Sequence, residues 1–214
     1  FDGIGGGLII PNTNNDFCDN NFTMSSWVTY TGDGWEGLFQ IGSETNRCGM
    51  CADTDGWMCY TEGTSNPLNL VFDCGDDDAV NNIEDGDYHL VTLTKNGSTY
   101  KMYVDGSQVV CTDDESGWNM GTDTRIGDDS QQNAWTGNIV DAFLYSKTLS
   151  EANILELYNG GAGKRADETS FYDFSYVTYY NDMDGLKDQS GNDNDLTTTN
   201  EPQQDPEGVP GIID

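Results

Sequence analysis

The sequence predicts an all-β protein, a two-sheet antiparallel jelly-roll sandwich with one short helix. Short stretches of alternating apolar and polar residues recur along the chain, separated by Gly, Asp and Asn. Tight hairpins are indicated by Asn96-Gly97 and Asp105-Gly106, each of which lies between two such stretches. A single sandwich domain often runs to about 200 residues, which suits a chain of 214.

The strands are expected where the alternation is clear. These segments are residues 7–11, 22–30, 37–41, 68–72, 88–95, 99–104, 107–111, 124–126, 137–145 and 177–181. One helix is expected over residues 150–158, because Ser150 is a favourable N-cap and Gly160 follows the last turn. Residues 159–173 contain no convincing strand, so the sequence predicts a surface linker there.

The chain is strongly acidic. It has 38 Asp and Glu residues against 8 Lys and Arg, a net charge of −30 and a pI near 4.1. Binding to nucleic acid or to anionic membranes needs clustered cations, so the charge argues against both partners. No stretch approaches the roughly 20 apolar residues of a membrane span. The chain opens at Phe1 without Met, as expected of a processed or excised segment.

An even number of cysteines in a polar, Lys-poor chain predicts an oxidising compartment and up to three disulfides. We therefore expect the protein to be extracellular or on a virion or cell surface. The pairing stays open among Cys18, Cys48, Cys51, Cys59, Cys74 and Cys111. The alternative is a zinc site, because Cys48-Gly-Met-Cys51 has the spacing of a zinc knuckle. No second such pair follows, and His89 is the one histidine.

Several segments carry motifs that are typical of one known family. Residues 22–28, Phe-Thr-Met-Ser-Ser-Trp-Val, resemble that family's "F-T-I-S-A-W-V" strand. Residues 85–94 and the following Tyr-Val-Asp-Gly of 103–106 are similar to its "W-H-x-V-x-x-T … Y-V-D-G". Residues 135–150 resemble its closing block, "G-x-I-D-x-V-x-I-Y-x-R-x-L-S". In this order and spacing the motifs cover most of the chain, which therefore resembles the laminin G-like, concanavalin A-like lectin family of jelly rolls.

The order of the blocks departs from the family. Its opening block, "L-V-A-Y-Y-x-F-D-G … D-x-S-G-N-x-N-D", resembles residues 177–185 and 188–195, which lie near the C-terminal end here. The resemblance therefore implies a main body over residues 1–158, a linker over 159–173 and a first-strand block over 174–214. The arrangement is circularly permuted or repeat-shifted, and the last block either closes this domain or is donated to a neighbour.

Catalysis is not expected. Glycosidases of this fold place paired carboxylates on one strand as "E-x-D-x-x-E", and the sequence has no such run. The resemblance also implies that His89 is structural.

The resemblance further implies a structural calcium ion. Calcium prefers six to eight oxygen ligands. The expected ligands are Asp2, Asp141, Asp188, Asn192 and Asn194. The alternative for residues 188–192 is a plain Asx turn without metal.

Sugar binding would use aromatic side chains in Gly- and Asp-rich loops, because an aromatic ring stacks on the apolar face of a pyranose. The candidates are Trp35, Trp57, Trp118 and Trp135, whereas Trp27 lies on a predicted strand and is expected in the core. Asn21 and Asn96 begin N-glycosylation sequons.

Two functions follow from these observations. The main hypothesis is a non-catalytic extracellular assembly module, the repeating unit of a fibre, filament or surface coat, whose partner is itself, head to tail. The alternative is a lectin-like adhesion module that binds glycans. The permuted order favours the first, and the loop tryptophans favour the second.

Overall fold

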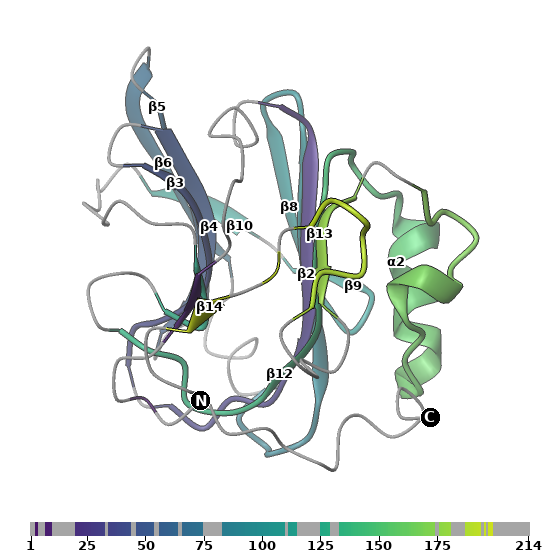
Figure 1. Cartoon of the computed structure of the whole chain (residues 1–214). Helices are drawn as coiled ribbons and strands as arrows, with labels where there is room; N and C mark the ends of the chain where they lie inside the picture. Colours follow the sequence, from purple (N-terminus) through teal and green to yellow (C-terminus); the bar gives the residue numbers. More distant parts are fainter. Residues whose placement is uncertain are drawn as a thin grey trace.

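The structure is a computed structural model. It describes residues 3, 7–9, 20–32, 34–43, 46–53, 56–63, 66–74, 83–109, 111–114, 125–128, 133–173, 176–180, 187–193, 195 and 197–198. Two antiparallel sheets face each other, and the helix α2 (Glu151–Tyr158) covers the outer face of one of them (Figure 1). The predicted two-sheet sandwich with a short helix is confirmed.

The first sheet has six strands and lies next to α2. Its order is β13 (Tyr176–Tyr180), β12 (Ile139–Tyr145), β2 (Phe22–Val28), β7 (His89–Asn96), β8 (Thr99–Val104) and β9 (Ser107–Val109). Two-residue turns join β7 to β8 and β8 to β9. Asp105 and Gly106 both have positive φ, at 51° and 76°, as the predicted hairpin turn requires.

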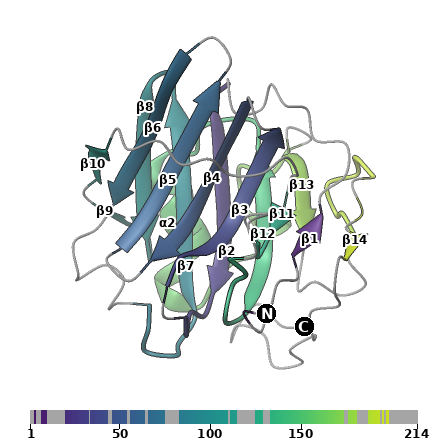
Figure 2. The same cartoon turned by 90° about the vertical axis from the view of Figure 1, so that its left-hand side faces the viewer.

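The second sheet has eight strands, and Figure 2 shows its outer face. Its order is β10 (Cys111–Asp114), β6 (Asn66–Cys74), β5 (Gly56–Gly63), β4 (Asn46–Asp53), β3 (Glu36–Ser43), β11 (Arg125–Ile126), β1 (Leu8–Ile9) and β14 (Thr197–Thr198). The strands β4 and β5 were not expected from the sequence, since neither has the alternating pattern.

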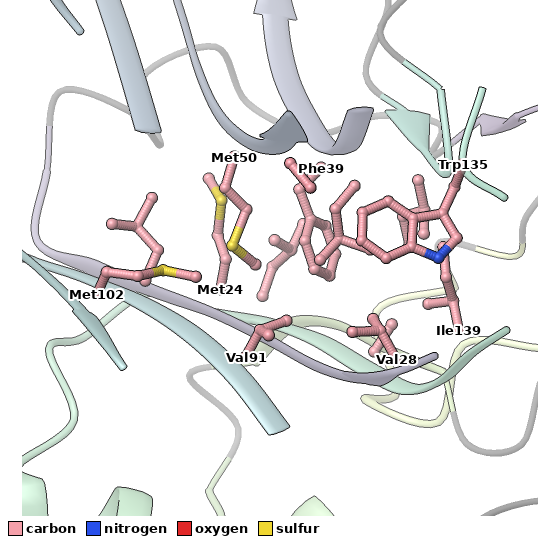
Figure 3. Packing of buried hydrophobic residues seen from close by; sticks show 14 of the residues in the cluster. Met24, Val28, Phe39, Met50, Val91, Met102, Trp135 and Ile139 are labelled. Atoms are coloured by element: carbon pink, nitrogen blue, oxygen red, sulfur yellow. The ribbon is translucent and has the colours of Figure 1, made fainter. Parts of the chain in front are cut away.

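The main core fills the space between the sheets (Figure 3). Alternate residues of β2, Met24 and Val28 among them, point across to Phe39 of β3 and Met50 of β4. Burial of each such side chain stabilises the fold by about 1.5–3 kcal/mol.

A second core lies between the six-stranded sheet and α2. Trp27, on the opposite face of β2 from Met24, is 1% exposed and stacks on Tyr158 of α2, with ring centroids 6.0 Å apart. Trp27 is therefore a core residue, as predicted. Because β2 has the main core on one face and the second core on the other, all seven of its residues are buried.

The segment over residues 159–173, expected to be a surface linker, forms no strand, and most of its residues are exposed or half-buried. It contains two short 3₁₀ helices, η2 (Asn159–Gly161) and η3 (Ala166–Glu168), and Ala166 is fully buried in the second core. Phe171 and Tyr172 pack against the same core. The segment adds apolar side chains to the layer that covers the sheet.

The C-terminal strands complete the sandwich of their own chain. β13 pairs antiparallel with β12, and Tyr179 lies opposite Phe143. β14 pairs with β1 in the other sheet. The block that the family has first in sequence thus lies at the edge of each sheet here.

Candidate functional site

One end of the sandwich carries several of the residues that the sequence singled out, among them Trp35, His89 and Trp135. The register places Val28 at the end of β2 beside His89 and Ile139, which begin β7 and β12. In the other sheet, Glu36 at the start of β3 lies opposite Ala52 near the end of β4. The connections at this end are named the loop end here; their described residues are 29–32, 34–36, 83–88, 105–106, 127–128 and 133–138.

Main-chain hydrogen bonds hold the loop end together across the two sheets. The amide of Thr31 donates to the Thr136 carbonyl at 2.9 Å, and the amide of Gly37 donates to the Asn133 carbonyl at 3.0 Å. The amide of Thr29 donates to the Asn138 carbonyl at 3.0 Å. Residues 29–37 are therefore fixed to residues 133–138, about 100 positions away in sequence, before any side chain is considered.

Trp135 supports this frame and is not a surface residue. It is fully buried, its ring lies 5.0 Å from that of Tyr30, and its indole Nε1 donates to the Thr29 carbonyl at 3.0 Å. Figure 3 shows the indole at one end of the main core. The prediction that Trp135 stacks on a sugar is wrong, because neither face of the ring is available to a ligand.

Glu36 is a buried carboxylate that the sequence reasoning did not select. It is 8% exposed, and both oxygens accept hydrogen bonds from Thr136: Oε2 from the amide at 2.6 Å and Oε1 from the hydroxyl at 2.8 Å. A β carbon at Gly32 would collide with the same carboxylate, 2.2 Å from Oε1. Glu36 therefore anchors the turn before β3. Its proximity to Thr136 could not be read from the sequence, which separates the two by 100 positions.

Among the other tryptophan candidates, Trp35 is at the loop end. It directly precedes β3 and is half-buried. Trp57 is the second residue of β5, opposite Ala52 and therefore at the same end of the sheet, and its side chain lies outside the described part. Trp118 lies outside the described residues altogether.

His89 is held between two carboxylates. Its Nδ1 lies 2.8 Å from Oδ2 of Asp105, and its Nε2 lies 3.0 Å from Oδ1 of Asp85. Burial opposes protonation of the ring, but the two carboxylates outweigh it and raise the pKa of His89. Hydrogen bonding to His89 lowers the pKa of Asp85. These contacts fit the structural role expected of His89, which links the start of β7 to the turn that precedes it, through Asp85, and to the turn between β8 and β9, through Asp105.

The expected calcium ligands are only partly described. Asp141 lies at a β-bulge of β12, has φ of 51° and is 2% exposed. Both oxygens of Asp188 accept hydrogen bonds from Ser190, from the amide at 2.9 Å and the hydroxyl at 2.8 Å, which is the geometry of an Asx turn. Asn192 is exposed and donates to Ser190. Asp2 and Asn194 lie outside the described residues. Within the described part of the chain, no three His, Cys, Asp or Glu side chains gather as a metal site.

The sequence allowed up to three disulfides among the six cysteines, and its inclusion of Cys51 among them is wrong. Cys48 is in a disulfide, whereas Cys51 is a buried thiol. Both belong to β4, where residues three apart point to opposite faces, and Cys48 faces the main core. The zinc-knuckle alternative fails because side chains on opposite faces of a strand cannot bind the same ion. Cys18 lies outside the described residues, and for Cys59, Cys74 and Cys111 only the backbone is described.

The two predicted glycosylation sequons lie side by side at the opposite end of the sandwich. Asn21 and Asn96 are both exposed, and Oδ1 of Asn21 accepts a hydrogen bond from the amide of Gly97 at 2.8 Å. Glycosylation at either residue stays a prediction. No helix in the described part of the chain has the length and apolar character needed to cross a membrane.

The two facing antiparallel sheets define a jelly-roll sandwich, and the comparison with known families agrees. A family model described as the concanavalin A-like lectin/glucanases superfamily, of the laminin G type, matches residues 2–155. The chain belongs to this superfamily. A search of curated protein sequences finds no match.

Solved structures share the fold at low sequence identity. A protein of Bacteroides ovatus proposed to bind carbohydrate is 15% identical with a TM-score of 0.51, over 92% of this chain and 58% of that one. The chain thus spans a little over half the length of that relative. The CBM40 module of the Ruminococcus gnavus IT-sialidase, bound to α2,3-sialyllactose, is 13% identical with a TM-score of 0.52, over 72% of this chain and 94% of the module. Trypanosoma rangeli sialidase is 19% identical with a TM-score of 0.50, over 74% of this chain and 26% of the enzyme.

Proposed function

We propose that the chain is a non-catalytic carbohydrate-binding module that works outside the cell and holds a glycan at the loop end. The observation that carries the proposal is Trp35, a half-buried aromatic side chain on a turn whose backbone is fixed to a second turn by main-chain hydrogen bonds. Sugar sites combine an aromatic surface with a few well-placed polar groups on a pre-formed frame. Two of the related structures are described as carbohydrate binding or as bound to a sugar, which supports the same function.

The non-catalytic part of the proposal rests on what the loop-end carboxylates do. A glycosidase needs one carboxylic acid and one carboxylate, about 5–10 Å apart and facing the substrate. Glu36 is hydrogen-bonded through both oxygens to Thr136, Asp85 and Asp105 hold His89, and Asp128 is paired with Arg125 at 2.5 Å. These groups support the frame. The disulfide at Cys48 supports the proposed extracellular location, because such bonds persist in oxidising compartments.

The assembly hypothesis has less support. One form of it has the C-terminal block donated to a neighbour, whereas β13 and β14 pair with β12 and β1 of the same chain. The tandem-repeat form is compatible with this pairing. The descriptions of the related structures also favour the lectin-like alternative.

A glycan array tests the proposal, with Trp35→Ala and Trp57→Ala as the site variants. We expect binding to at least one glycan class, and a loss of about tenfold or more in affinity when Trp35 is truncated, because stacking on an aromatic ring contributes about 1–3 kcal/mol in comparable sites. Tyr100→Ala is the matched control: Tyr100 is a half-buried aromatic residue of β8 at the opposite end of the sheet. Unchanged melting temperatures would show that the variants are folded. Binding to no glycan, or equal loss in the Tyr100 control, would refute the proposal.

A further inference from the structure

The cations of this chain are few, and the structure shows the partners of most of them. Anionic sugars, such as sialylated or sulfated glycans, carry a carboxylate or a sulfate that proteins recognise with Arg or Lys. The chain has eight such residues against 38 acids. Five of them are in ion pairs: Arg125 with Asp128, Lys147 with Asp173, Lys164 with Glu156, Arg165 with Asp167, and Lys187 with Asp195.

The remaining three cations lie away from the loop end. Lys95 donates to the Asn20 carbonyl and lies over the ring of Tyr100. Lys101 is exposed and lies opposite Thr94 of β7, which in turn lies opposite Thr23 of β2. Thr23 is five residues along β2 from Val28, which places Lys101 about 17 Å from the loop end at 3.4 Å per residue. Arg47 lies opposite Gly42, near the turn that joins β3 to β4 at the other end of the sheet.

The loop end itself is negative. Arg125 precedes it and is held by Asp128, while His89 is held by Asp85 and Asp105. The described acids of this end are Glu36, Glu84, Asp85, Asp87, Asp105 and Asp128. Glu84, Asp85 and Asp87 are exposed. Among the described residues of this end, an anionic sugar would meet carboxylates, and the one Arg beside them is already paired with Asp128. Its binding would cost free energy, because like charges repel most where water is excluded.

We propose that the loop end selects uncharged glycans and rejects sialylated and sulfated ones. This inference rests on the proposed function, and it names the ligand class of the same site. It sets the chain apart from the CBM40 module of the same fold, which is described as bound to sialyllactose. The selectivity comes from repulsion of the wrong ligand in addition to contacts with the right one.

The test is an array of matched glycans, each printed in a neutral, a sialylated and a sulfated form, and read at low and at high salt. We expect every bound glycan to be neutral, with affinity for its anionic forms lower by about tenfold or more at low salt. The difference should narrow at high salt, because ions screen the repulsion between exposed charges. Preference for any anionic form over its neutral parent would overturn the inference while leaving the proposed function intact. Binding to no glycan at all would overturn both.

A charge-reversal pair separates electrostatics from the shape of the site. In the double variant Glu84→Lys and Asp87→Lys, two exposed acids of the loop end become cations. We expect the affinity for anionic forms to rise several-fold relative to the neutral forms. Glu168→Lys is the control, because Glu168 is an exposed acid on η3, next to the second core. An unchanged ratio in the double variant, or an equal change in the control, would contradict the inference.

Discussion

His89 is the residue at which the loop end responds most directly to pH. Both ring nitrogens face carboxylates, so the ring is most favourable when it is protonated and donates through both. The Asp105 carboxylate also accepts the amide of Leu90 at 3.0 Å, which ties the turn at residues 105–106 to the start of β7. The charge of the imidazolium thus offsets two nearby negative charges.

We expect His89→Asn to lower the free energy of unfolding by about 1–2 kcal/mol in mildly acidic solution, because it leaves Asp85 and Asp105 without the cation between them. The pKa of His89 is raised in the folded state, so the wild-type advantage is fully present below the ordinary histidine pKa of about 6.5 and is lost as pH rises through the raised value. Urea unfolding of both proteins across that pH range measures the difference. An advantage that does not vary with pH would show that His89 contributes only packing.

Gly137 is required by the close approach of two turns. Its φ is +139°, and a β carbon there would lie 2.0 Å from the carbonyl oxygen of Thr29. We expect Gly137→Ala to destabilise the protein by about 1–3 kcal/mol, since the turn at 29–35 would have to move away. Gly34→Ala is the matched control in the same turns, because a β carbon there meets no atom within 4 Å. Thermal unfolding of the two variants compares them, and equal melting temperatures would contradict the explanation.

Trp135 shows where residue-scale prediction from sequence stops. Its neighbours in sequence are small and polar, which is typical of a loop, and the ring was therefore expected at the surface. Its burial depends on Tyr30 and the Thr29 carbonyl, which come from a turn more than 100 positions away. Trp27 was predicted correctly because its burial follows from the alternation within its own strand.

The helix α2 is joined to the segment after it by one carboxylate. Glu156 accepts hydrogen bonds from Lys164 Nζ at 2.6 Å, from the Ser170 amide at 2.9 Å and from the Ser170 hydroxyl at 2.6 Å. The hydrogen bond from Lys164, followed by those from Ser170, lowers the pKa of Glu156 to about 2. The carboxylate therefore helps to keep Phe171 and Tyr172 on the second core.

We expect Glu156→Gln to reduce stability by about 1 kcal/mol at neutral pH, because a charge-assisted hydrogen bond becomes a neutral one. A lowered carboxyl pKa stabilises the folded state above the unfolded pKa of 4.5, and this contribution is lost as pH falls through about 2. The variant and the wild type should thus converge in acid. Denaturant titrations at several pH values follow this, with the exposed Glu168→Gln as a control that should match the wild type.

The pairing of β6 with β10 bears on the disulfides. The backbone register places Cys111 directly opposite Cys74. The Cβ atoms of such cross-strand pairs are generally about 4.5–5.5 Å apart, slightly more than the roughly 3.5–4.5 Å of a disulfide. We expect these two residues to be joined, which peptide mapping under non-reducing conditions can establish. Recovery of Cys111 in a peptide linked to any other cysteine would rule the pairing out.

Elements with local signals were predicted well, and those without were missed. The helix begins after Ser150, whose side chain accepts the Asn153 amide while Asn153 reaches back to the Ser150 amide. The hairpins follow from their Asn-Gly and Asp-Gly turns. In β4 and β5, by contrast, Gly, Cys and Met replace the alternating pattern, and these strands form because neighbours on both sides pair with them. The contacts of Ala166, Phe171 and Tyr172 with the second core were not predicted, because the apolar residues of this segment are few and follow no strand or helix period.

Calcium binding would depend on the fold of the whole molecule, because the ligands expected from the resemblance are far apart in sequence. It can therefore be tested through the stability of the whole protein. An ion bound only by the folded state stabilises it by mass action. If the site forms, removal of calcium with a chelator should lower the melting temperature by roughly 5–10 °C. Asp141→Asn should abolish that dependence, and magnesium serves as the control cation. A melting temperature that is the same in calcium and in chelator would remove the site.

The main-chain bonds between the two turns of the loop end have a consequence for protein engineering. The amides of Thr31 and Gly37 donate to the carbonyls of Thr136 and Asn133, and these two hydrogen bonds involve main-chain atoms alone. The Thr31 hydroxyl also donates to the Thr136 carbonyl, at 3.3 Å. Thr31 and Asn133 can be randomised in a display library while Trp135, Glu36 and Gly137 are kept. Specificity and stability are then encoded by separate sets of residues. The domain would serve as a scaffold on which new recognition is selected without redesign of the fold.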